Sequence, residues 1–192
     1  MRLDINPIAF HNTRVKVRPP ALLQVVRQIN ELSDYIENMP IRNDMLDTAD
    51  PYIRRFYHKK TLMEILAAKQ YFLDNSRENE KLSFMISSIL HILHVNRPYA
   101  LSRMSHGLTP LARSGGFVYK SLINSLSNKV HRALSKPLPS NFIMGEAFQG
   151  NVLEIPLSDS SVDAIITSPT FMESTRFFAN NRIIHSALSN CA

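Results

Sequence analysis

The residues whose types and order are best suited to chemistry are Ser168, Pro169 and Phe171. They follow a largely apolar run at residues 162–167 of this 192-residue chain. Ser168 offers a side-chain oxygen and Pro169 a carbonyl oxygen, and two such acceptors can polarise an amine attached to a flat ring. Phe171 offers an aromatic face on which that ring can stack. This order predicts a site for a weakly nucleophilic ring amine. The simpler alternative is a buried strand followed by a Ser-Pro turn.

The same residues carry a family resemblance. Asp163-Ala164-Ile165-Ile166-Thr167-Ser168-Pro169-Thr170-Phe171 resembles the catalytic motif Asp-x-Ile-Ile-Thr-Ser-Pro-Pro-aromatic of S-adenosylmethionine-dependent DNA methyltransferases of the amino-group class. Thr170 stands where the second proline is usual. The resemblance implies methyl transfer from S-adenosylmethionine to the exocyclic amine of adenine or cytosine in DNA. Ser168 and Pro169 would polarise the amine of a flipped base, and Phe171 would stack on its ring.

Two further segments are similar to the same family. Gly150-Asn151-Val152-Leu153, followed by Ser158-Asp159-Ser160-Ser161-Val162-Asp163, resembles a run in which an acid lies near the adenine of the cofactor; Asn151 takes the place of that acid. Leu3-Asp4-Ile5-Asn6-Pro7-Ile8-Ala9 resembles a segment whose acid accepts hydrogen bonds from the ribose hydroxyls. The resemblance therefore implies that Asp4 and Asn151 contact the cofactor.

The resemblance also implies an α/β fold: a partial doubly wound, Rossmann-like methyltransferase sheet with a large basic helical insertion. We expect a cofactor-half strand and helix in residues 1–40, the insertion in residues 41–140, and the strands of the catalytic motif in residues 141–192. No Gly-x-Gly occurs in the sequence. The family's glycine-rich loop is therefore expected about 20 residues upstream of Asp4, so the chain is expected to be part of a longer enzyme.

A long central stretch carries charge of one sign. Residues 81–145 contain no Asp or Glu and eight Lys or Arg, whereas the rest of the chain has 14 basic and 16 acidic residues. This distribution favours an anionic polymer as partner, and the resemblance implies that the polymer is double-stranded DNA. The alternative is a basic face that contacts only solvent. The cations expected to contact DNA are Arg97, Arg103, Arg113, Lys120, Lys129 and Arg132.

Hydrophobic periodicity predicts the elements that position these groups. A short strand is expected to end near Asp4, and Thr61 and Glu64 have the spacing of a capping box at the start of a helix. Helices are predicted at residues 20–39, 61–72, 82–95 and 117–134. Loops are predicted at residues 43–51 and 96–116. Strands are predicted at residues 147–155 and 162–167, the second buried on both faces, with a turn at residues 156–161.

Other kinds of site are disfavoured. The single cysteine, Cys191, leaves no disulfide or Cys-based zinc site within the chain. His91 and His94 lie one helical turn apart without a carboxylate nearby in sequence, so no metal site is expected. No Gly-x-Ser-x-Gly places a hydrolase nucleophile.

The sequence contains no apolar run of about 20 residues and no recognisable secretory signal. We therefore expect a cytoplasmic protein without a membrane partner, and a restriction endonuclease is a further candidate partner. The competing hypothesis is a non-catalytic DNA-binding protein whose useful part is the acid-free stretch at residues 81–145.

Overall fold

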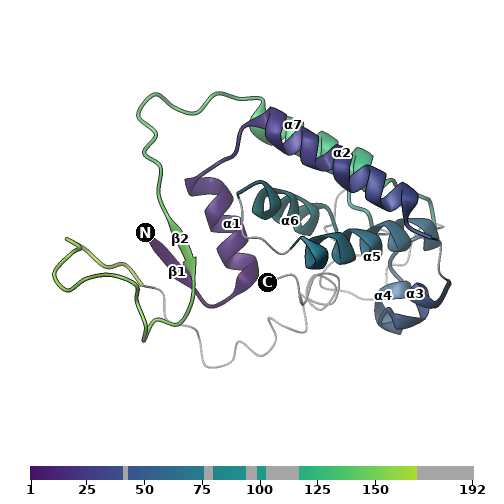
Figure 1. The fold of residues 1–192 in the computed structure, drawn as a ribbon, viewed down its shortest axis with the longest axis horizontal. Helices are drawn as coiled ribbons and strands as arrows, with labels where there is room; N and C mark the ends of the chain where they lie inside the picture. Colours follow the sequence, from purple (N-terminus) through teal and green to yellow (C-terminus); the bar gives the residue numbers. More distant parts are fainter. Residues whose placement is uncertain (41–42, 76–79, 94–98, 103–116, 168–192) are drawn as a thin grey trace.

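Two short strands from distant parts of the chain form a parallel pair. The computed structural model describes residues 1–40, 43–75, 80–93, 99–102 and 117–167. Strand β1 (Arg2–Asp4) lies beside β2 (Ala147–Gln149) with Leu3 opposite Phe148. Parallel strands need a crossover connection. Here the chain between β1 and β2 forms that connection and includes all the described helices (Figure 1).

Helix α1 (Pro7–Val17) follows β1 almost at once. The Asn6 side chain accepts a hydrogen bond from the Ile8 amide at 2.9 Å, and Pro7 occupies the first helical turn. Asparagine is a favoured cap, and proline lacks the N–H that the first turn would leave unpaired. Helix α1 was not predicted from the apolar spacing; the Asn-Pro pair is the local signal for its start.

Four longer helices confirm the main predictions from periodicity. They are α2 (Leu22–Asn38), α5 (Lys59–Asp74), α6 (Glu80–Leu93) and α7 (Leu122–Leu134). The loop expected at residues 43–51 is wrong in part, since α3 (Asn43–Thr48) and α4 (Pro51–Arg54) form there. Asp50 caps α4 by accepting from the Tyr52 amide at 2.8 Å. Periodicity misses such short helices because they span too few turns to show an apolar face.

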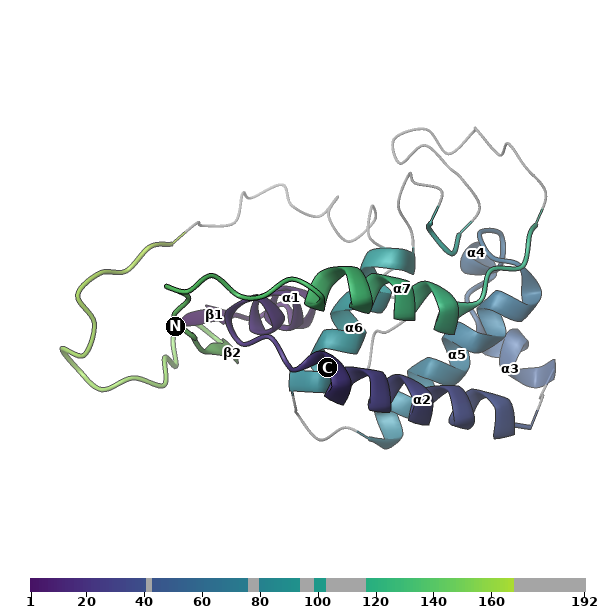
Figure 2. The same cartoon turned by 90° about the horizontal axis from the view of Figure 1, so that it is seen from above.

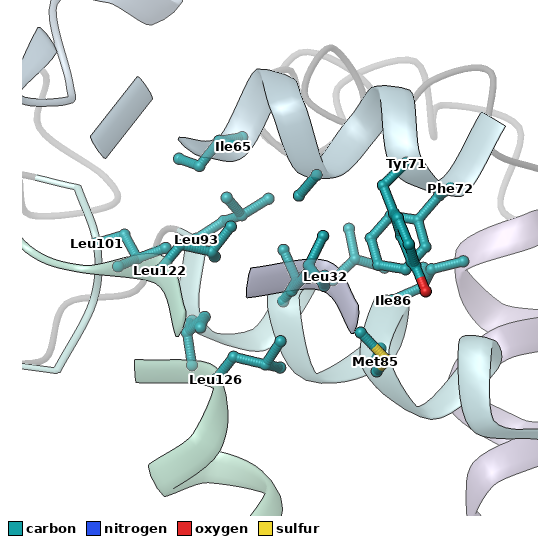
Figure 3. Close-up of a cluster of buried hydrophobic side chains, with 14 of the residues drawn as sticks. Leu32, Ile65, Tyr71, Phe72, Met85, Ile86, Leu93, Leu101, Leu122 and Leu126 are labelled. Atoms are coloured by element: carbon teal, nitrogen blue, oxygen red, sulfur yellow. The ribbon is translucent and has the colours of Figure 1, made fainter. Parts of the chain in front are cut away.

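The hydrophobic core lies where the longer helices converge (Figure 3). Leu32 of α2, Ile65 of α5, Met85 of α6 and Leu126 of α7 are all buried in it. Burying one such side chain contributes roughly 1.5–3 kcal/mol to folding. On α7 the buried residues Leu122, Leu126 and Val130 recur every four residues, so one face of α7 packs into the core and the opposite face stays available to solvent.

The sheet lies beside α1 at one end of the molecule, and α3 and α4 lie near the other end (Figures 1 and 2). The strand expected at residues 147–155 ends at Gln149, and residues 151–167 form turns and irregular chain that extends away from the helices. The turn expected at residues 156–161 is present, with Ser160 at φ 55°.

The prediction of a doubly buried strand at residues 162–167 is wrong in this structure. Ile165 is 76% exposed and Ile166 is 98% exposed, and no strand forms there. A parallel strand of this kind becomes buried only when sheet and helices cover both faces, and β1 and β2 are the only strands in the described residues. The described chain is thus mixed helical with a small parallel sheet, and none of its helices is long and apolar enough to cross a membrane.

Candidate functional site

Asp4 ends β1, and Asn151 follows two residues after the end of β2. Asp4 is the last residue of β1 and lies opposite Gln149 of β2, and the Gly150 amide donates to the Asp4 carbonyl at 3.2 Å. Asn151 follows directly. We call Asp4, Gly150 and Asn151 the strand edge. In open α/β sheets, ligands bind just outside the carboxyl ends of the strands, and the strand edge is the corresponding end of this two-stranded sheet.

Local hydrogen bonds fix the two side chains at the strand edge. Asp4 Oδ1 accepts from the Asn6 amide at 3.0 Å, and Asn151 Oδ1 accepts from the Leu153 amide at 3.1 Å. Within the described part of the chain, no other group hydrogen-bonds to the Asp4 carboxylate, which is partly exposed. Its second oxygen is suited to accept a hydrogen bond from a ligand hydroxyl.

Gly150 keeps the strand edge closely packed. A Cβ atom at this position would lie 3.3 Å from Leu3 Cδ1, which is tighter than an ordinary contact. A larger residue here would therefore require the Leu3 side chain to shift by a few tenths of an ångström.

The predicted catalytic residues Ser168, Pro169 and Phe171 lie outside the described residues. The stretch that leads to them, from Asp163 to Thr167, is exposed throughout. The structure therefore places the two predicted cofactor residues at the same end of the paired strands but provides no geometry for the three predicted catalytic residues.

A second feature is a basic pocket of about 310 Å³ beside α7. One side is formed by the outward face of α7 and its capping residue. These polar positions follow helical spacing and are Ser121, Asn124, Ser125, Asn128, Lys129 and Arg132. Ile92 at the end of α6, Tyr99 and Lys120 complete the lining, which includes no carboxylate. All three predicted DNA contacts that the structure describes, Lys120, Lys129 and Arg132, thus line one pocket.

Lys120 has a structural task within this pocket. Its ammonium group donates to the carbonyl of Ala100 and, at 3.2 Å, to that of Ser102. Burial lowers the pKa of Lys120 below its usual value. Because its donors are directed at the backbone, Lys120 holds residues 99–102 against α7, and it is less suited than the other two cations to bind an external anion.

Lys129 and Arg132 remain as the cations of the pocket. The Arg132 guanidinium carbon lies 5.5 Å from the centre of the Tyr99 ring, and the ring of His91 stacks on Tyr99 at a centroid distance of 5.9 Å. A cation–π contact of this kind orients the guanidinium. Burial, with a further contribution from the Arg132 charge, lowers the pKa of Lys129.

Side chains of α5 hydrogen-bond to the backbone at the beginning of α7. Thr61 Oγ1 donates to the Lys120 carbonyl at 2.8 Å and accepts from the Lys120 amide at 3.0 Å. The Glu64 carboxylate accepts from the Leu122 amide at 2.7 Å and from the Tyr119 hydroxyl at 2.6 Å. The capping-box interpretation is therefore wrong: His58 caps α5, while Thr61 and Glu64 hold the chain that enters α7.

Arg97, Arg103 and Arg113, the other predicted DNA contacts, lie outside the described residues. Sequence reasoning missed Asn124 and Asn128, because it sought charge alone. The four-residue spacing of Asn124 and Asn128 could have identified them, because it places both on one side of α7, where they line the pocket together with Lys129. In the part of the chain that the structure describes, no three His, Cys, Asp or Glu side chains gather as potential metal ligands.

Comparison with known proteins assigns no relative to this chain. No family model matches it, and neither the curated proteins nor the solved structures give a significant match.

Proposed function

We propose that this chain is part of an S-adenosylmethionine-dependent DNA methyltransferase of the amino-group class, built on a partial Rossmann-like sheet. The observation that carries the proposal is the parallel pairing of β1 with β2, which sets Asp4 opposite Gln149, two residues before Asn151. The motif resemblance selects the same two residues as cofactor contacts from segments that are far apart in the sequence. A two-stranded parallel edge with an acid and an amide also fits the ligand position of open α/β sheets.

The side chains of the strand edge suit the adenosine part of the cofactor. The partly exposed Asp4 carboxylate can accept hydrogen bonds from ribose hydroxyls, and the Asn151 amide can donate to and accept from a purine edge. S-adenosylmethionine supplies the methyl group. Ser168, Pro169 and Phe171 are proposed to hold the target amine and its ring, on the strength of the motif alone.

Titration of the chain with S-adenosylmethionine, followed by amide NMR shifts, tests this proposal. Shifts are expected to concentrate at residues 4–6 and 149–151. Asp4→Ala should weaken binding about tenfold or more, because a hydrogen bond to a charged group contributes roughly 1.5–3 kcal/mol. Asp34→Ala removes an exposed carboxylate on α2 and should bind as the parent does.

A titration without shifts at the strand edge, or with equal affinity in parent and Asp4→Ala, would contradict the cofactor assignment. DNA binding in that same protein would then favour the competing function, a non-catalytic DNA-binding module. The basic pocket beside α7 is the observation that favours this second function.

A further inference from the structure

The basic pocket beside α7 contains two cations, Lys129 and Arg132. Lys129 and Arg132 are three residues apart on one helix, and neither pairs with a carboxylate of the described residues. Like charges at this spacing repel, and burial of a lysine costs further free energy. A cation near a helix carboxyl terminus gains from the helix dipole, but this gain does not require Lys129 to be half-buried beside another cation.

The neutral side chains of the pocket are suited to an oxyanion. Asn124 and Asn128 lie one turn apart, and their side chains make no hydrogen bond within the described part of the chain. Each amide provides two N–H donors, and Ser125 adds a hydroxyl. A guanidinium, an ammonium and amide donors on one wall form the donor set that binds phosphate oxygens, since arginine can engage two oxygens at once.

Two backbone amides at the amino end of α7 already have acceptors within the protein. The Glu64 carboxylate accepts from the Leu122 amide, and the Ser121 hydroxyl accepts from the Asn124 amide at 3.3 Å. An anion is therefore not drawn to the first turn of α7. The free donors instead lie along its side and toward its carboxyl half.

We propose that the pocket binds a phosphate ester through Lys129, Arg132 and Asn128, with Arg132 held in place by Tyr99. The polar row from Ser121 to Arg132 extends about 16 Å along α7, so it is long enough to follow a nucleic-acid strand rather than to enclose one small anion. The assignment of that strand to DNA rests on the proposed function. The phosphate site itself does not depend on the strand edge.

Fluorescence anisotropy with a short labelled duplex, measured over a range of salt concentrations, tests the site. Lys129→Gln/Arg132→Gln should weaken binding roughly tenfold or more at low salt and should reduce the salt slope by about two, because each lost phosphate contact lowers that slope by roughly one. The matched control Arg27→Gln/Lys59→Gln removes the same charge from exposed positions on α2 and α5. The control should change binding far less.

Three further measurements keep the outcome clear. Glutamine propagates helices nearly as well as lysine or arginine, so circular dichroism should show that the pocket variant is folded. Lys129→Arg/Arg132→Lys retains both charges and should recover most of the binding. In the parent, NMR shifts on adding inorganic phosphate should concentrate at residues 124–132.

Equal weakening by the pocket and control variants, or full binding by the folded pocket variant, would overturn the site. Adenosine monophosphate is added as a competitor at a concentration equal to that of the phosphate groups in the labelled duplex. If it displaces the duplex, the site binds a free nucleotide and the assignment to a nucleic-acid strand is overturned. Asp4→Ala should leave this binding unchanged. A chain that binds DNA through the pocket but not S-adenosylmethionine would contradict the cofactor assignment of the strand edge and retain the phosphate site.

Discussion

His11 is a buried polar residue at the contact between α1 and α6. Its Nδ1 lies 3.1 Å from the Ser83 hydroxyl, and its Nε2 is buried with no hydrogen-bond partner among the described residues. Burial, with a smaller contribution from the Arg14 charge, lowers the pKa of His11 from 6.5 to about 4. The folded protein therefore favours the neutral ring.

This shift predicts a pH dependence of stability. Because the folded pKa lies below the unfolded value, protonation favours the unfolded chain, so the contribution is complete above pH 6.5 and is lost as the pH falls toward 4. At about pH 5 the expected loss of unfolding free energy is about 2 kcal/mol. Urea unfolding at neutral pH and near pH 5 measures this loss.

His11→Gln should remove most of that dependence. His131→Gln serves as the control, since His131 is exposed on α7 and water solvates its ring in both the folded and the unfolded chain. The interpretation fails if His11→Gln loses as much stability on acidification as the parent does.

At the scale of the elements, the contact between α5 and α7 determines where α7 begins. Thr61 and Glu64 are one turn apart on α5, and both hydrogen-bond to the backbone at Lys120 and Leu122. A carboxylate at the amino end of a helix also interacts favourably with the helix dipole. Since α7 carries core residues on one face and the basic pocket on the other, this contact positions both.

Glu64→Ala is expected to lower the free energy of unfolding by about 1–3 kcal/mol, because it leaves the buried Leu122 amide without an acceptor. Chemical denaturation measures the change. Glu37→Ala removes an exposed carboxylate from α2 and should change stability by no more than roughly 0.5 kcal/mol. Equal stability of the two variants would show that the α5–α7 contact contributes little.

At the scale of the whole molecule, a packed helical body adjoins a sheet with only two described strands. Residues 151–167 are exposed along their whole length, and this stretch includes Leu153 at 85% exposure. The segment extends away from the helices (Figure 2). Such a segment can enter a protease without unfolding of the core.

Limited digestion with a glutamate-specific protease should therefore cut first after Glu154. Of the other described glutamates, Glu31 and Glu37 are exposed but lie in α2, which must unfold locally before cleavage. Glu146 is exposed as well, but its carbonyl accepts from the Arg2 amide at 2.9 Å and it directly precedes β2. Mass spectrometry of early time points identifies the first product. Initial cleavage within α2 would contradict the arrangement described for residues 151–167.

Local patterns in the sequence determined much of the helical body. The spacing of apolar residues predicted α2, α5, α6 and α7, because a helix that packs on one side repeats its buried residues every three to four positions. The Asn-Pro pair before α1 and Asp50 before α4 are local signals of the same kind. The acid-free stretch likewise identified the three cations that line the basic pocket.

The tertiary structure decided what depends on a partner distant in sequence. The pattern at Thr61 and Glu64 fits a capping box, yet their partners lie 59 and 58 residues away. The apolar run at residues 162–167 fits a buried strand, but burial requires neighbouring strands that the described structure does not provide. Parallel pairing set Asp4 opposite Gln149, two residues before Asn151, and local periodicity does not encode such pairing between distant segments.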